Sequence, residues 1–139
     1  MFMCRLSCCL ALIFLMQSAG PVSAEWVALE DQYQFHPLQM LYIDPDTIHR
    51  AGHEVTISAL IDWKAMQGGR TPTRFYSTKL TKQVDCAAKR VRTVTATDYY
   101  GHMGTGEVIG GGPYTSADHW VGIEPGTINR GLWEVSCKK

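Results

Sequence analysis

Hydrophobic and polar residues alternate along much of the chain after residue 25. The clearest stretch is residues 54–64, where Val55, Ile57 and Ala59 fall on one side and polar residues fall mainly on the other. A period of two is typical of a β-strand that buries one face. Leu60 is the one apolar exception on the outer side. The pattern therefore predicts a sheet with one buried face.

The same reasoning predicts further short strands in sequence order. Together with the first, their expected ranges are 26–29, 40–43, 54–64, 75–86, 91–100 and 107–109. Residues 75–86 and 91–100, joined by a short connection, are expected to form a long hairpin.

Turn residues separate the expected strands. Asp44-Pro45-Asp46 is expected to stop the second strand, and residues 50–53 form another turn. Residues 31–39 and 66–72 are expected to be loops, and Gly110-Gly111-Gly112-Pro113 is expected to end the last strand.

The end of the chain has a helical period. Ile128, Leu132 and Val135 lie at i, i+4 and i+7, on one face of a helix of about three turns. Pro125 suits its first turn, and Gly131 within it costs about 1 kcal/mol relative to alanine. Strands followed by one helix predict an α+β domain: about six antiparallel strands with one C-terminal helix packed on one face.

The N-terminus carries the features of a cleavable signal peptide. Arg5 supplies positive charge, and small residues precede a cleavage site after Ala24. The apolar run of residues 6–16 covers 11 residues, whereas a helix needs about 20 to cross a bilayer. We therefore expect residues 1–24 to be removed and residues 25–139 to form one exported domain. Its expected location is the periplasm or the medium, with the cell surface as a third alternative. A retained anchor is the alternative that the short run disfavours.

Two cysteines remain in the expected mature chain. Cys4, Cys8 and Cys9 belong to the leader, and no cysteine follows the apolar run until Cys86, so a lipid anchor is not expected. In an oxidising compartment, the pair Cys86 and Cys137 is most simply a disulfide. It would tie the helix to the hairpin and, by closing a loop of roughly 50 residues, stabilise the domain by at most about 4 kcal/mol.

Net charge disfavours two classes of partner. The chain has 13 basic and 13 acidic residues and a pI near 6.9. A nucleic-acid-binding domain normally carries a basic stripe and a high pI, and attachment to anionic lipid also needs excess positive charge. We expect that the protein does not bind nucleic acid and that the chain has no stable membrane span.

Motifs for catalysis and for metal binding are weak. The glycines from Gly104 to Gly110 open no helix, so a β-turn is expected instead of a nucleotide loop. His49 and His53 lie in turn-like sequence, and the adjacent His102 and Met103 cannot be opposite ligands of one haem within a protomer. No nucleophile motif is present. We expect no metal site and no enzymatic activity, although a carboxylate pair could still meet in the fold.

One segment is a candidate binding site. Tyr99, Tyr100, His102 and Met103 cluster at a glycine-rich turn. Aromatic and methionine side chains at a turn often form the edge of a core. Exposed together, they would form an apolar patch of the kind that marks an interaction surface.

The ordered motifs of the chain resemble a known family. These motifs are Trp26-Val27, the segment from Tyr42 to Ile48, Cys86 after a long strand, the segment from Tyr99 to Gly106, and Pro125-Gly126-Thr127-Ile128 with Leu132-Trp133 and Cys137. Together they resemble the bacterial surface-adhesin protein E family over nearly the whole mature chain.

The resemblance implies a fold and a function. It implies a six-stranded antiparallel sheet whose C-terminal helix is held on the concave face by the disulfide. It also implies surface exposure, adhesion to host proteins such as laminin, vitronectin and plasminogen, and haem binding by a dimer. We expect an exported, non-enzymatic binding protein with a protein partner. The alternative is a small-molecule carrier, with haem as the candidate ligand, that uses the groove between helix and sheet; a homodimer is compatible with both.

Overall fold

The computed structural model describes residues 25–34, 36–69, 73–113 and 118–138. The expected signal peptide, residues 1–24, lies outside the described residues and stays a prediction. Part of the expected loop at 66–72 also lies outside them.

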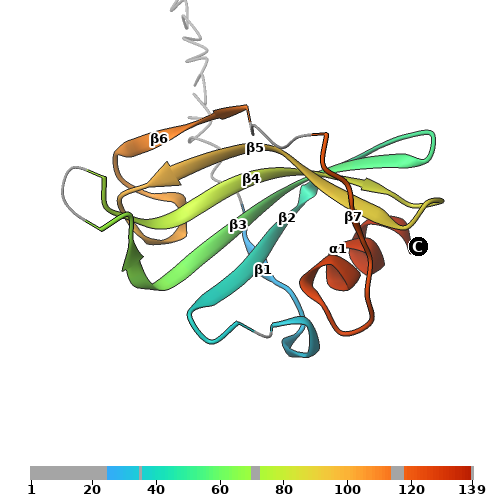
Figure 1. Cartoon of the computed structure of the whole chain (residues 1–139), viewed down its shortest axis with the longest axis horizontal. Helices are drawn as coiled ribbons and strands as arrows, with labels where there is room; N and C mark the ends of the chain where they lie inside the picture. Colours follow the sequence, from blue (N-terminus) through green and yellow to red (C-terminus); the bar gives the residue numbers. More distant parts are fainter. Residues whose placement is uncertain (1–24, 35, 70–72, 114–117, 139) are drawn as a thin grey trace, which may run out of the picture.

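An antiparallel sheet and one α-helix dominate the described residues (Figure 1). In chain order the elements are β1 (Val27–Ala28), η1 (Asp31–Tyr33), β2 (Gln39–Ala51), β3 (Glu54–Gln67), β4 (Phe75–Asp85), β5 (Arg90–Tyr99), η2 (His102–Gly104), β6 (Val108–Pro113), β7 (Val121–Gly122) and α1 (Ile128–Cys137), where η marks a 3₁₀ helix. The strands follow the order β1-β2-β3-β4-β5-β6, and β7 pairs with β5. The α+β prediction is confirmed, with the short β7 as an addition.

The core lies between one face of the sheet and α1. Val55, Ile57 and Ala59 of β3 are buried as their alternation predicts. Leu132 of α1 is fully buried and belongs to the same cluster as Ile57 and Leu80. Burial of side chains of this size contributes about 1.5–3 kcal/mol each. This apolar contact places α1 across β3, β4 and β5.

A side-chain cap and a close aromatic contact fix the helix. Thr127 caps its N-terminus by accepting a hydrogen bond from the Arg130 N–H. The expectation that Pro125 lies in the first turn is therefore wrong by a few residues, since the cap follows it. Gly131 faces the Tyr33 ring, and a Cβ there would lie 2.8 Å from the ring carbon Cγ. The glycine that weakens the helix locally is thus the residue that lets Tyr33 approach.

The disulfide joins Cys86, just after β4, to Cys137 at the end of α1, with the two Cα atoms 5.6 Å apart. The expected pairing and its position are confirmed. Trp133 Nε1 donates to the Cys86 carbonyl oxygen, and Arg50 of β2 donates to the Ser136 carbonyl oxygen. Several strands therefore hold the C-terminal end of the helix.

The expectation that Asp44-Pro45-Asp46 ends the second strand is wrong. β2 continues to Ala51, with a register shift between Asp44 and His49. Side chains replace the interrupted ladder: Asp44 accepts from the Asp46 N–H, and Thr47 Oγ1 donates to the Asp44 carbonyl and accepts from the Ser58 N–H. A bulge tolerates Pro45 because no ladder donor is needed there.

The expectation that the glycine run ends the last strand is also wrong. β6 includes Gly110-Gly111-Gly112-Pro113 and pairs with β5. A Cβ on Gly111 would lie 2.7 Å from the Thr97 Cα, so the close approach of the two strands requires glycine. Within the described register β6 has only one strand neighbour, and such an edge position accommodates proline.

Candidate functional site

The turn between β5 and β6 folds over the sheet face opposite α1. Leu60 and Asp62 of β3 alternate with Ala59 and Ile61, whose side of the strand packs toward the core. A Cβ on Gly104 of η2 would lie 3.5 Å from a methyl carbon of Leu60. Leu60 therefore lies on the outer side of the strand, as expected, and the turn buries it fully there. This cover explains why an apolar residue occupies the outer side.

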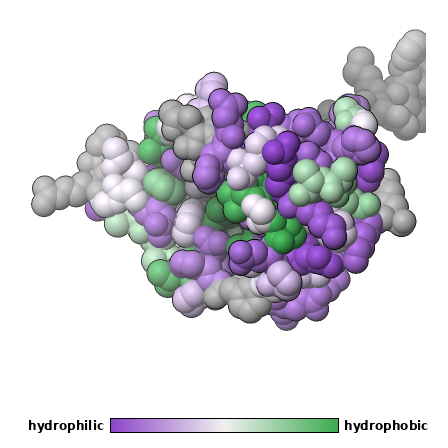
Figure 2. Space-filling model, turned by 45° about the vertical axis from the view of Figure 1, so that its right-hand side comes forward, coloured by the Kyte–Doolittle hydropathy of each residue, from purple (hydrophilic) through white to green (hydrophobic). Residues whose placement is uncertain are grey.

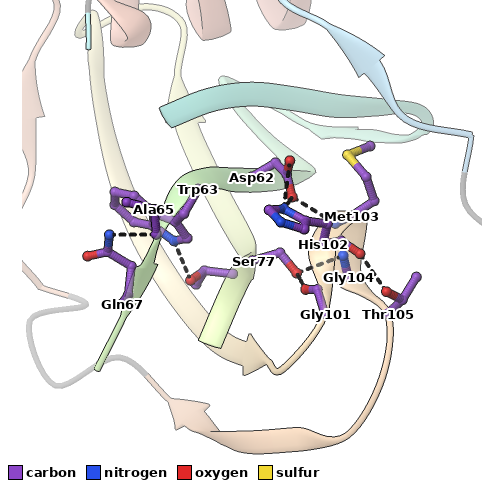
Figure 3. Close-up of polar contacts among 11 residues, drawn as sticks. Asp62, Trp63, Ala65, Gln67, Ser77, Gly101, His102, Met103, Gly104 and Thr105 are labelled. Carbon is purple, nitrogen blue, oxygen red and sulfur yellow. Dashed lines mark hydrogen bonds and ion pairs between the residues drawn. The ribbon is translucent and has the colours of Figure 1, made fainter. Parts of the chain in front are cut away.

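The Asp62 carboxylate holds the turn from β3 (Figure 3). Its Oδ1 accepts from the Met103 backbone N–H at 2.8 Å and contacts His102 Nδ1 at 3.1 Å. The imidazole of His102 also contacts the Tyr76 ring, since the two ring centroids are 4.7 Å apart. One carboxylate therefore orients both the backbone and the imidazole of the turn.

The Ser77 hydroxyl holds the same turn from β4. Ser77 is fully buried, and its Oγ donates to the Gly101 carbonyl at 2.6 Å and accepts from the Gly104 N–H at 2.8 Å. The three groups satisfy one another in a site shielded from water, where an unpaired polar group would cost about 1–3 kcal/mol.

The backbone of the turn is left-handed at consecutive positions. Met103 has φ 55° and Gly104 has φ 69°. A non-glycine residue rarely adopts this region without support, and the Asp62 bond to the Met103 N–H provides it. The structure has the expected turn at Gly104, in the form of the 3₁₀ helix η2, whereas Gly110 lies in β6.

The turn brings the four predicted binding residues to one corner of the sheet with different exposures. Tyr100 is 48% exposed, and the His102 side chain is 54% exposed. Tyr99 is half-buried beneath the Lys79 ammonium, which lies 4.8 Å from its ring centroid, and Met103 is also half-buried. Tyr100 and His102 are the accessible pair, and their role in binding stays a prediction.

Asp62, Ser77 and His102 are residue types of a hydrolase triad, but their bonds differ from it. A triad needs the histidine to accept the serine proton. Here Ser77 Oγ donates to the Gly101 carbonyl. These three residues form a structural clasp that holds the turn against the sheet. Sequence reasoning missed it because 40 residues separate Asp62 from His102.

A cavity of about 320 Å³ lies beside this corner. Trp26 and Tyr99 line it together with hydroxyl groups and the Asp44 and Lys79 side chains. Two further cavities flank α1. One of about 520 Å³ is lined by His36, Pro37 and residues at the helix start, and one of about 550 Å³ lies between β1, η1 and Glu134 with Val135.

Cations surround two tryptophans near the disulfide. Arg90 and Arg92 stack on Trp120 at 4.4 and 4.5 Å from the ring centroid. Trp133 is approached by Lys89, Arg130 and Lys138 at 5.3, 4.7 and 5.2 Å. Hydrogen bonding from the Ala88 N–H, with Arg90 beside it, lowers the pKa of the Asp85 carboxyl. Lys138 and Arg130 lower the pKa of Glu134 in the same way. Basic residues and aromatic rings therefore gather at the opposite end of β5 from Tyr100.

The described residues also bear on metal binding and on a membrane span. Within the described ranges, no group of three or more His, Cys, Asp or Glu side chains is placed to hold a metal ion. Over the same residues, no helix is both long enough and apolar enough to cross a membrane.

These observations define a small domain of one antiparallel sheet, one disulfide-bound helix and one clasped surface turn. The chain belongs to the surface-adhesin protein E family, whose model matches residues 26–138. The family supports a surface adhesin-like role, an exported or surface location and contact with other proteins, and it suggests a non-enzymatic protein.

Solved structures of one protein share the fold. A selenomethionine form of protein E from Haemophilus influenzae has a TM-score of 0.62 and 16% identity, covering 84% of this chain and 88% of that one. Protein E from non-typeable H. influenzae has a TM-score of 0.58 and 16% identity, covering 81% and 75%. None of the curated protein sequences matches this chain. At this identity the likeness shows the fold alone.

Proposed function

We propose that this protein is an exported, non-enzymatic binding protein that contacts a protein partner through the β5–β6 turn. The observation that carries the proposal is the clasp: Asp62 and Ser77 fix a surface turn whose exposed side chains include Tyr100 and His102. Membership in a surface-adhesin family supports a partner of this class.

A rigid turn is suited to binding for a physical reason. Ordering a loop on association costs free energy, and a preformed loop avoids that cost. Tyrosine is enriched among the residues that dominate binding energy, because it buries a large area with few rotatable bonds. Tyr100 would supply the apolar contact and His102 a polar contact at its side.

The test compares two exposed apolar positions. The protein with its disulfide intact would be passed over immobilised laminin, vitronectin and plasminogen. Loss of a central tyrosine costs about 2 kcal/mol or more, so Tyr100→Ser is expected to weaken binding at least tenfold. Leu38→Ser, at a residue that is 47% exposed on another part of the chain, is the matched control. No retained partner at micromolar concentration, or equal loss in both variants, would refute the proposal.

A haem carrier is the second candidate. The specific observation is the cavity of about 520 Å³ at the start of α1, where His36 lies among Pro37 and Ile128. His36 Nδ1 accepts from the Leu38 N–H at 3.2 Å. Ligation through Nε2 requires a lone pair there, so the imidazole would have to give up this bond.

Hemin titration tests this candidate. A shifted Soret band that is lost in His36→Ala and kept in His49→Ala would support it. An unchanged band on addition of hemin would end it. Sedimentation in the same samples would test whether a dimer forms with or without hemin.

A further inference from the structure

A lysine lies on the buried side of β4. Leu80, Lys82 and Val84 have the same parity, and Leu80 and Val84 belong to the core cluster. Lys82 is half-buried. Its ammonium donates to Thr93 Oγ1 at 2.7 Å on β5. Among the described residues, no carboxylate lies within ion-pair distance of this ammonium.

A cavity of about 250 Å³ opens at this lysine. Lys82, Thr93, His119 and Asn129 line it with polar groups. Arg92 also borders it, but its Nε donates to Gln83 Oε1 at 2.8 Å on the other face of the sheet. The cavity lies on the edge of β5 where β7 pairing ends at Val91 and β6 pairing begins at Thr95. One cation and several neutral polar groups therefore converge on one hollow.

The start of α1 adds to the positive field. Asn129 is the second residue of the helix, and a helix N-terminus favours a nearby anion through its unpaired N–H groups.

We infer that this cavity binds a small oxyanion, namely a phosphate, sulfate or carboxylate group, with Lys82 as its charged partner. The volume of about 250 Å³ accommodates one tetrahedral anion or the anionic end of a larger molecule. Figure 2 brings the helix end of the molecule toward the viewer and shows a mainly hydrophilic surface around a small hydrophobic centre. The site is distinct from the β5–β6 turn, so either can fail without the other.

Burial agrees with this inference, because desolvation lowers the pKa of the Lys82 ammonium to about 8. A bound anion stabilises the charged ammonium and raises that pKa. Binding and protonation of Lys82 are therefore linked, and the linkage gives a second readout.

The experiment titrates the disulfide-intact protein at pH 7 and fixed ionic strength with inorganic phosphate, sulfate, acetate and methyl phosphate, using chloride as the reference. The Thr93 and Asn129 amide signals are expected to shift saturably in NMR spectra. Methyl phosphate binding as tightly as phosphate indicates that the site accepts the end of a larger molecule; tighter binding of phosphate indicates a free ion.

Two lysine variants with the same charge change complete the test. Lys82→Met is expected to weaken binding at least tenfold, and Lys64→Met, on an exposed part of β3, to leave it unchanged. In the parent protein, phosphate is expected to raise the pKa of Lys82. Equal binding by both variants, or Thr93 and Asn129 signals that shift no more with the oxyanions than with chloride, would overturn the inference. Asn129→Asp, which places a carboxylate at the cavity and keeps the lysine, is expected to weaken binding and decides the case if Lys82→Met does not fold.

Discussion

The helix α1 and the β5–β6 turn lie on opposite faces of one sheet and are held by different interactions. Apolar burial of Leu132 and the Cys86–Cys137 bond hold the helix. Hydrogen bonds hold the turn, with Asp62 accepting from the Met103 N–H and Ser77 donating to the Gly101 carbonyl. Apolar burial is non-directional, whereas hydrogen bonds fix the direction of each group. The helix side of the sheet therefore provides stability, whereas the turn side provides a defined surface geometry.

Removing the disulfide should give the largest effect and should separate the two regions. Cys86→Ser with Cys137→Ser is expected to lower the free energy of unfolding by up to about 4 kcal/mol, because the unfolded chain regains the freedom of a loop of roughly 50 residues. Amide hydrogen exchange should accelerate in α1 first and leave the Met103 and Gly104 amides protected. An unchanged melting temperature, or equal loss of protection in both regions, would contradict the comparison.

Lys82 should make the helix side respond to alkaline pH. Its pKa is about 8 in the folded protein against 10.5 as its ordinary value. Between these values the unfolded chain binds more protons, so the free energy of unfolding should rise as pH increases from about 8 to about 10.5. At roughly 1.4 kcal/mol per pKa unit the gain is at most about 3 kcal/mol, and contact with solvent reduces it. Chemical unfolding across this range should show the rise, and Lys82→Met should lack it while Lys64→Met keeps it.

Ser77→Ala should act on the turn alone. It leaves the Gly101 carbonyl and the Gly104 N–H without their partner, at a cost of about 1–3 kcal/mol. The Gly104 amide should lose protection while α1 amides change only with global stability. Thr81→Ala, on the same face of β4, is the control, because Thr81 bonds Thr95 and not the turn. Equal effects of the two variants would show that Ser77 is not a specific support.

Local patterns in the sequence explain most of the sheet but less of its irregularities. Alternation in β3 correctly predicts the burial of Val55 and Ile57, since a strand has a fixed period. The Asp44–His49 bulge depends on Thr47 bonding Ser58 of the next strand. These two residues are 11 positions apart on neighbouring strands, so local sequence rules do not predict their contact.

The site is harder to predict because its parts are distant in sequence. The segment from Tyr99 to Met103 is recognisable by composition, yet its supports Asp62 and Ser77 come from two other strands. Lys82 offered a local signal, as a charged residue with the parity of core residues in β4. Its cavity still requires α1 and the segment before β7 to meet it.

His102 should have the smallest effect on stability and the sharpest effect on function. Its imidazole contacts Asp62 at 3.1 Å but is largely exposed, and an exposed pair contributes about 0–1 kcal/mol. His102→Ala should therefore leave the melting temperature and the protection of the Met103 amide nearly unchanged, because Asp62 still accepts from that N–H. Asp62→Ala removes both bonds and should release the turn.

Partner binding should distinguish these two variants by mechanism. If His102 contacts the partner, His102→Ala lowers affinity with the turn intact, mainly through faster dissociation. Asp62→Ala lowers affinity through a mobile turn, and Asp62→Asn, which keeps an acceptor for the Met103 N–H, should restore most of it. Full affinity in His102→Ala together with loss in Asp62→Ala would place the contact on Tyr100 and its neighbours and would leave the clasp as the feature on which binding depends.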